Sequence, residues 1–272
     1  MSKPPSTTAD VHLKPLVAGA PIWTRFFDAN QRFCRRRLKP RLYPVSHMTA
    51  LNCWYERRVP NTGAGTSLEF GCGRDLPLTH LLGSRFAARF ATDIEAVPPE
   101  LVPPEVTFKP CTAETIPFRD DSFDVVLVRS VIEHLEDPVH TFRELARVTK
   151  PGGFVFMNLP NKWDYVSVAA RLSGSMKSWI LNSVVRTNMD DFPVHYRCNT
   201  RREMTAVAAK TGFDVIEFTP LPSQPSYLGF FVPLYVLGVL YQVAIGLLGL
   251  DALQPSFVVT LRRAASTEPI CQ

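Results

Sequence analysis

Short apolar runs alternate with segments of helical spacing through the middle of the chain. The runs are rich in valine, leucine and phenylalanine, and their length suits strands that are buried on both faces. They occupy residues 67–70, 89–93, 106–109, 123–128 and 154–158. Helical spacing follows two of them, over residues 76–86 and 138–148. This alternation predicts an α/β fold with a mostly parallel sheet.

The C-terminal third adds a helix and two further strands. Residues 200–210 form a predicted helix, because Thr200 and Glu203 have the spacing of a capping box. Strands are predicted at residues 213–218 and 256–262, and a long apolar segment separates them.

A glycine-rich turn joins the first predicted strand to the first predicted helix. The strand carries Glu69, and Gly71, Cys72 and Gly73 follow. Two glycines one residue apart allow a tight turn and a close approach of backbone to a ligand. Asp93, twenty residues past Gly73, ends the second strand. An acid there accepts hydrogen bonds from the two hydroxyls of a ribose, so the pattern predicts a nucleoside ligand.

The turn alone does not identify that ligand. A dinucleotide fingerprint requires a third glycine where Leu76 stands. The Glu69 carboxylate would repel a pyrophosphate, whereas it suits an ammonium or sulfonium group. A nicotinamide-dependent oxidoreductase is therefore disfavoured, while a doubly wound fold whose first turn merely contains Gly and Glu stays open.

Further motifs follow the turn in a fixed order. They are Thr112 to Phe118, the strand end at Arg129, Ser130 to Pro138, and the helix stop Lys150 to Gly153. With the glycine turn and Asp93, this series resembles the class I S-adenosylmethionine-dependent methyltransferases over residues 50–160. The resemblance implies a Rossmann-like, doubly wound sheet of seven strands, mostly parallel, with an antiparallel C-terminal hairpin. It also implies S-adenosylmethionine as the cofactor.

The resemblance also implies which residues bind the cofactor. They are Glu69, Gly71, Cys72, Gly73, Asp93, Ile94, Thr112, Ala113, Glu114, Arg129 and Ser130. Asp93 would bind the ribose hydroxyls, Ile94 would contact the adenine face, and residues 112–114 would lie along the adenine edge. Many relatives have Asp where Thr112 stands and Gly where Asp75 stands, which leaves a cofactor-free relative as an alternative.

Transfer of an activated methyl group mainly requires alignment of the acceptor and removal of its proton. His134 is the expected base, because it follows the fourth strand and an imidazole titrates near neutral pH. His195 is the second candidate. The alternatives are that His134 only hydrogen-bonds its turn, or that the chain is a catalytically inactive binding module. We otherwise expect O-methylation of a small-molecule or lipid-linked acceptor, such as a sugar or a phenol.

The resemblance implies that an insertion at residues 160–199 covers the acceptor pocket. Residues 161–165 and 195–197 resemble bacterial members associated with glycan and cell-envelope biosynthesis. Their aromatic, acidic and imidazole groups suit a sugar or a phenol, although they are equally able to hold the insertion on the sheet.

Composition sets the size and compartment of the molecule. The chain has 272 residues, of which 46% are hydrophobic and 20% charged, enough for a large core in one domain. Its six cysteines show no C-x-x-C pair, so we expect a reducing compartment and no metal site. The N-terminal residues are polar and include prolines, and they lack the apolar stretch that a signal peptide contains. A cytoplasmic location is therefore expected.

The net charge of +5 is unevenly distributed. The first 60 residues contain eleven Lys and Arg against three Asp and Glu, and the basic residues are densest over 32–41. Such a cluster suits an anionic membrane or an acidic substrate, and a solvated helix face remains open. Nucleic acid is not expected, because no recognised nucleic-acid module accompanies the cluster.

The apolar segment at residues 226–250 bears on the same question. It is long enough to span a bilayer, which takes ~20 apolar residues. One crossing would place the last strand on the wrong side of the membrane, so we expect the segment in the interface, with Pro233 dividing it into two short helices. With the basic cluster it would make a peripheral contact on the inner membrane face. The alternative is a buried helical insert or a dimer contact.

The predicted organisation therefore has three parts. They are a basic helical N-terminal cap at 1–60, a methyltransferase domain at 61–265 that includes both insertions, and a tail at 266–272.

Overall fold

The chain folds into two compact units. The computed structural model describes residues 21–42, 46–165, 167–168, 192–222 and 225–265. The sheet unit comprises Asn52–Lys162, Pro193–Pro220 and Ser256–Gln272. The helical unit comprises Met1–Leu51, Trp163–Phe192 and Leu221–Pro255. The predicted tail and most of the predicted acceptor insertion, at residues 166 and 169–191, lie outside the described residues.

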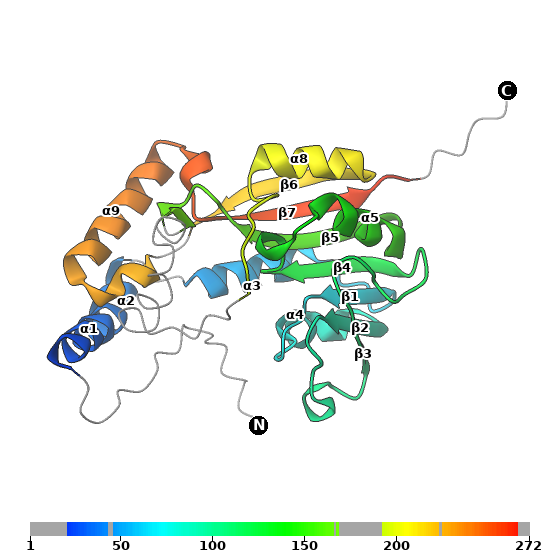
Figure 1. The fold of residues 1–272 in the computed structure, drawn as a ribbon, viewed down its shortest axis with the longest axis horizontal. Helices are drawn as coiled ribbons and strands as arrows, with labels where there is room; N and C mark the ends of the chain where they lie inside the picture. The colour runs from blue at the N-terminus through cyan, green and yellow to red at the C-terminus, as the bar shows by residue number, and fades with distance from the viewer. Residues whose placement is uncertain (1–20, 43–45, 166, 169–191, 223–224, 266–272) are drawn as a thin grey trace. The chain divides into compact units, whose positions relative to one another are not determined.

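The sheet unit is built on seven strands in the order β3-β2-β1-β4-β5-β7-β6 (Figure 1). Their bounds are β1 Thr66–Phe70, β2 Ala88–Asp93, β3 Val106–Pro110, β4 Phe123–Arg129, β5 Thr149–Pro160, β6 Phe213–Leu221 and β7 Ser256–Arg263. The first five pair in parallel, and β7 runs antiparallel to β5. The predicted seven-stranded, mostly parallel sheet is confirmed.

Helices cover both faces of this sheet. Strand side chains alternate between the faces, and Leu68 of β1, Val126 of β4 and Met157 of β5 share one core with helices α5 (Pro138–Val148) and α8 (Arg201–Lys210). On the other face lies α3 (His47–Arg58), whose Trp54 ring is 6.1 Å from that of Phe156. Short helices η3 (Pro99–Leu101) and η4 (Ile132–His134) lie in the connections.

The predicted capping box at the start of α8 is confirmed. The Thr200 side chain accepts a hydrogen bond from the Glu203 backbone N–H and also bonds the Glu203 carboxylate. The helix predicted at residues 76–86 is shorter than expected. Helix α4 spans only Pro77–Leu82, followed by the 3-10 helix η2 (Gly83–Arg85). Leu76 adopts a left-handed conformation with φ of 40°, so the helix begins at the proline.

The helical unit contains α1 (Ile22–Phe33), the π-helix η1 (Cys34–Leu38) and α2 (Lys39–Leu42). From the apolar segment come η7 (Ser226–Phe230), α9 (Val232–Leu247) and η8 (Asp251–Leu253). The segment forms two helices, as expected, with the break at Phe231, just before Pro233, and the second helix is longer than expected. Pro233 lies in the first turn of α9, where its missing N–H leaves no helical hydrogen bond unmade. Among the described residues, none of the helices is both long enough and apolar enough to cross a membrane.

The glycine turn is fixed to its neighbours by its own backbone. The N–H groups of Gly71 and Cys72 both donate to the Thr92 carbonyl, at 2.9 and 3.0 Å. The Gly73 N–H donates to Oδ2 of Asp93 at 2.7 Å. Gly71 has φ of +71°, and a Cβ added there would lie 2.2 Å from Cγ2 of Val131. The turn after β1 is therefore held against the end of β2 and against the segment that follows β4.

Glu69 lies buried beneath this turn, at 2% exposure. Its two carboxylate oxygens accept the N–H groups of Leu78 and Thr79, at 3.0 and 2.6 Å, and so bond the start of α4. Burial raises the pKa of Glu69 from 4.5 to about 7, against the opposing effect of these hydrogen bonds.

Substituting Gly71 should destabilise the protein more than substituting Gly73. Both have positive φ, so alanine costs about 1 kcal/mol in strain at either site. Gly71→Ala adds a collision with Val131 that we expect to cost about 1–3 kcal/mol more, whereas a Cβ at Gly73 meets nothing within 4 Å. Urea unfolding measures both, and adding Val131→Ala should recover part of the Gly71→Ala loss. Equal losses at the two glycines would contradict the contact.

Glu69 should make the unfolding free energy depend on pH. Because its pKa is raised in the folded state, the native protein binds more protons than the unfolded chain between pH 4.5 and about 7. The stability contributed by the protonated group is therefore lost as the pH rises through this window, by roughly 2–4 kcal/mol. Denaturation series should show this slope flattened in Glu69→Gln and unchanged in the control Glu100→Gln. An unchanged slope in Glu69→Gln would rule out the shift.

Candidate functional site

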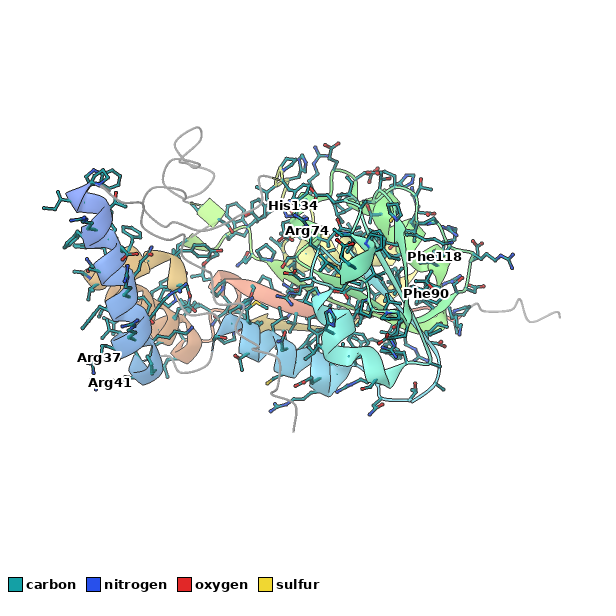
Figure 2. The ribbon with its side chains drawn as sticks, turned by 90° about the horizontal axis from the view of Figure 1, so that it is seen from below. Arg37, Arg41, Arg74, Phe90, Phe118 and His134 are labelled. Atoms are coloured by element: carbon teal, nitrogen blue, oxygen red, sulfur yellow. The ribbon has the colours of Figure 1, made fainter. Side chains whose placement is uncertain are left out.

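The predicted site residues gather at the carboxyl ends of the central strands. Strand β1 lies between β2 and β4. The strands that follow β1 in sequence first extend the sheet on one side of it, as β2 and β3, and then on the other, as β4 and β5. Phe70 and Val128 are register partners, which brings the ends of β1 and β4 together. In doubly wound sheets, ligands bind where the strand order reverses in this way. Figure 2 shows the labelled side chains of Arg74, in the turn, and His134, after β4, in the same part of the sheet unit.

Asp93 is oriented at the end of β2 by two backbone hydrogen bonds. Its Oδ2 accepts the Gly73 N–H and its Oδ1 accepts the Glu95 N–H at 3.0 Å. Each carboxylate oxygen has a second lone pair, so the group remains able to accept ribose hydroxyls. The next residue, Ile94, leaves 63% of its surface exposed. A fixed carboxylate beside an exposed apolar side chain fits the ribose and the face of a nucleobase.

The glycine turn offers space rather than N–H donors. All three of its N–H groups, from Gly71 to Gly73, donate within the protein. The direction of a side chain at Gly73 is open, whereas at Gly71 it is filled by Val131. Cys72 is 1% exposed and packs in an apolar cluster, so only its backbone can face a ligand. A turn whose N–H groups are all engaged, close in sequence to the acid Glu69, suits a cationic ligand group better than a phosphate.

The loop after β3 is tied to β2 and to α5. The Cys111 N–H donates to the Asp93 carbonyl at 2.9 Å. Nε2 of His140 lies 3.1 Å from the Glu114 carbonyl, to which it donates. Ala113 packs against the core, while the side chains of Thr112 and Glu114 are exposed. These bonds place residues 112–114 next to the end of β2, as the adenine edge requires.

The end of β4 carries a half-buried charge and a strained residue. Burial lowers the pKa of Arg129, and the nearby Tyr55, Glu69 and Asp75 oppose that shift. Ser130 follows with φ of 54°, in the left-handed region that few non-glycine residues adopt. Such strain is common where a turn positions ligand-binding groups.

The two candidate histidines lie on segments that contact each other. The backbone N–H groups of His195 and Tyr196 donate to the Glu133 carbonyl, at 2.7 and 3.2 Å. Nδ1 of His134 lies 2.8 Å from the Pro193 carbonyl. Nε2 of His195 lies 3.6 Å from a carboxylate oxygen of Glu136. Residues far apart in the sequence are thus brought to the loop that follows β4.

Two residues that support the site were missed in the sequence. Tyr55, of α3, is fully buried, and its hydroxyl donates to the Val128 carbonyl at 2.6 Å and lies 3.4 Å from Oδ1 of Asn158. Asn158 could have been found, because it is a polar residue near the end of an apolar strand. Nothing in the local sequence distinguishes Tyr55. Among the described residues, no group of three or more His, Cys, Asp or Glu is arranged to hold a metal ion.

Comparisons with known proteins agree with this geometry. Residues 68–157 match the family model of a methyltransferase domain. An uncharacterized methyltransferase of Schizosaccharomyces pombe is 55% identical over 40 residues, 15% of this chain and only 14% of that protein. A ubiquinone biosynthesis O-methyltransferase of Pseudomonas fluorescens strain Pf0-1 is 25% identical over 64% of this chain and 76% of its own.

The fold has counterparts among solved structures. A geranyl diphosphate methyltransferase in complex with S-adenosylmethionine superimposes with a TM-score of 0.51 and 17% identity, over 79% of this chain and 85% of that one. This likeness supports the same arrangement of strands in the two proteins, and it gives no information on the methyl acceptor of this chain. The matched model, together with the strand order and the carboxylate at the end of β2, identifies residues 68–157 as a methyltransferase domain with a Rossmann-like fold.

Proposed function

We propose that this protein transfers a methyl group from S-adenosylmethionine to an oxygen of a small-molecule or lipid-linked acceptor, such as a phenol or a sugar. The observation that carries the proposal is the orientation of His134 at the end of β4, within the same edge of the sheet as the glycine turn and Asp93. The O-methyltransferase from Pseudomonas fluorescens supports oxygen as the methylated atom.

The cofactor would be held by groups that the fold has already oriented. Asp93 would accept the ribose hydroxyls, Ile94 would cover the adenine face, and the exposed loop at 112–114 would lie along its edge. The turn at Gly71–Gly73 would face the cationic part, with open space at Gly73. Bound there, S-adenosylmethionine supplies a methyl group that its sulfonium has already activated.

His134 would act as the base. A carbonyl oxygen only accepts hydrogen bonds, so Nδ1 of His134 donates to Pro193. The neutral imidazole then carries its lone pair on Nε2, the nitrogen able to take a proton from an acceptor hydroxyl.

Glu133 would stabilise the imidazolium that forms. One of its carboxylate oxygens lies 4.0 Å from Nε2 of His134. Burial raises the pKa of Glu133, and a positive charge on His134 opposes that shift. A positive charge on His134 therefore favours the ionised form of Glu133. His195 lies on the segment that contacts this loop, with Nε2 near Glu136, and we assign it the role of orienting the acceptor.

Removing the Asp93 carboxylate should weaken binding of S-adenosylmethionine at least tenfold, or about 1.4 kcal/mol. Isothermal titration of Asp93→Ala measures this, and Asp93→Asn should lose less because it retains one acceptor oxygen. The control Asp214→Ala removes an exposed acid elsewhere in the sheet unit and should bind as the wild type does. Thermal unfolding without ligand separates lost affinity from loosening of the Gly73 turn. Wild-type affinity in a folded Asp93→Ala variant would overturn the assigned cofactor site.

Replacing His134 by alanine should lower turnover by ~100-fold while the affinity for S-adenosylmethionine stays nearly constant. The assay follows the S-adenosylhomocysteine formed during turnover with a panel of phenols and glycosides. His195→Ala should raise the KM for the acceptor by a larger factor than it lowers turnover. A loss of only a few-fold in His134→Ala would mean that alignment, without a base, accounts for catalysis. Cofactor binding by the wild type without turnover on any acceptor would favour an inactive binding module.

A further inference from the structure

Helix α9 is apolar on both of its faces. The face directed into the helical unit carries Tyr235, Gly238, Val239, Gln242 and Ile245, all buried. Residues three or four apart on the opposite face are exposed: Leu234 by 37%, Leu237 by 62%, Leu240 by 60%, Val243 by 48% and Leu247 by 84%. No charged residue occurs between Phe218 and Leu250. An apolar surface of this extent in water marks an interaction site.

The length of α9 suits a helix that lies in an interface. It has 16 residues, which extend about 24 Å, whereas the hydrocarbon core of a bilayer is about 30 Å thick. The exposed row would enter the boundary between headgroups and acyl chains, where interfacial helices bury their apolar face.

The helices at the N-terminus of the same unit are strongly basic. Residues 22–42 contain seven Lys and Arg against one acid, Asp28, which is buried and paired with Arg32. Arg36, Arg37 and Arg41 are exposed, and Figure 2 labels the last two near the end of this helical stretch. Exposed Trp23, Phe26 and Phe33 lie along α1. Arginine beside exposed aromatic rings fits a surface of anionic headgroups over apolar chains.

Direct contacts hold the basic and apolar helices in one unit. The rings of Phe27 and Phe230 meet edge to face, 5.7 Å apart. The Val232 N–H donates to Oδ1 of Asn30 at 3.4 Å. Cys34 packs with Tyr235 and Val239 in one buried cluster. The two features therefore act as one body.

We infer that the helical unit docks on an anionic lipid surface, with the exposed leucines of α9 entering the interface and Arg36, Arg37 and Arg41 meeting the phosphates. A protein partner would have to supply an apolar groove and an acidic patch separately, whereas anionic lipid supplies both in one surface. A polybasic patch and an apolar insertion together hold a protein stably, while either alone is marginal. The inference is independent of the methyl acceptor.

Flotation with vesicles tests the docking. The full chain should float with vesicles of equal parts phosphatidylcholine and phosphatidylglycerol, and less with phosphatidylcholine alone. Replacing Arg36, Arg37 and Arg41 by Gln should lower partition onto the anionic vesicles by about 100-fold. Replacing Leu237 and Leu240 by Ser should remove the binding that persists at high salt, where electrostatic attraction is screened.

Matched controls lie on exposed positions of the sheet unit. One control variant carries Leu101→Ser and Ile216→Ser, and the other replaces Arg119, Arg143 and Arg202 by Gln. Both should float as the wild type does. Retained binding of S-adenosylmethionine shows that the sheet unit of each variant is folded, and an unchanged helical signal in circular dichroism shows the same for the helical unit. Failure of the wild type to float with either vesicle would overturn the inference. So would a vesicle-independent dimer, seen by light scattering, that the Leu237→Ser and Leu240→Ser variant abolishes.

Discussion

The candidate site depends on the hydrogen bonds that join the glycine turn to the end of β2. The Thr92 carbonyl accepts two N–H groups of the turn and the Asp93 carboxylate accepts the third. The Gly73 bond, with that from the Glu95 N–H, fixes the Asp93 carboxylate at the edge of the sheet before any ligand arrives. The reorganisation that ligand binding would otherwise require is thereby reduced, because the acceptor groups are already ordered.

Beneath the turn, Glu69 couples helix α4 to the charge of the site. It bonds two backbone N–H groups at the start of that helix, yet burial raises its pKa to about 7. A cation above the turn would favour the ionised carboxylate. Ligand binding and ionisation of Glu69 would then strengthen one another by linkage, and the same charge would strengthen the hydrogen bonds to α4. One side chain would thus connect the local stability of the fold with ligand affinity.

Features of the structure that are encoded locally could be predicted from the sequence. The apolar strands follow from their periodicity, and the Thr200–Glu203 capping box from a spacing of three residues. The end of α4 differs most from the prediction, because helical spacing gives no sign that the chain tightens into a 3-10 helix at Gly83. Contacts between distant segments had no local signal. The filling of the Gly71 side-chain direction by Val131 and the bond from Tyr55 to the Val128 carbonyl both depend on strand order and register.

The same distinction applies to the functional groups. Position after β4 identified His134 as a candidate base, but only the contact with Pro193 determines which of its nitrogens carries the proton. That proline lies 59 residues further along the chain, in the segment that precedes α8. The tautomer of His134 is therefore set by the backbone carbonyl of a residue far away in the sequence. The proposed catalytic role of His134 depends on this contact. On the proposed mechanism, changes in the segment that contains Pro193 would alter proton transfer without altering the histidine itself.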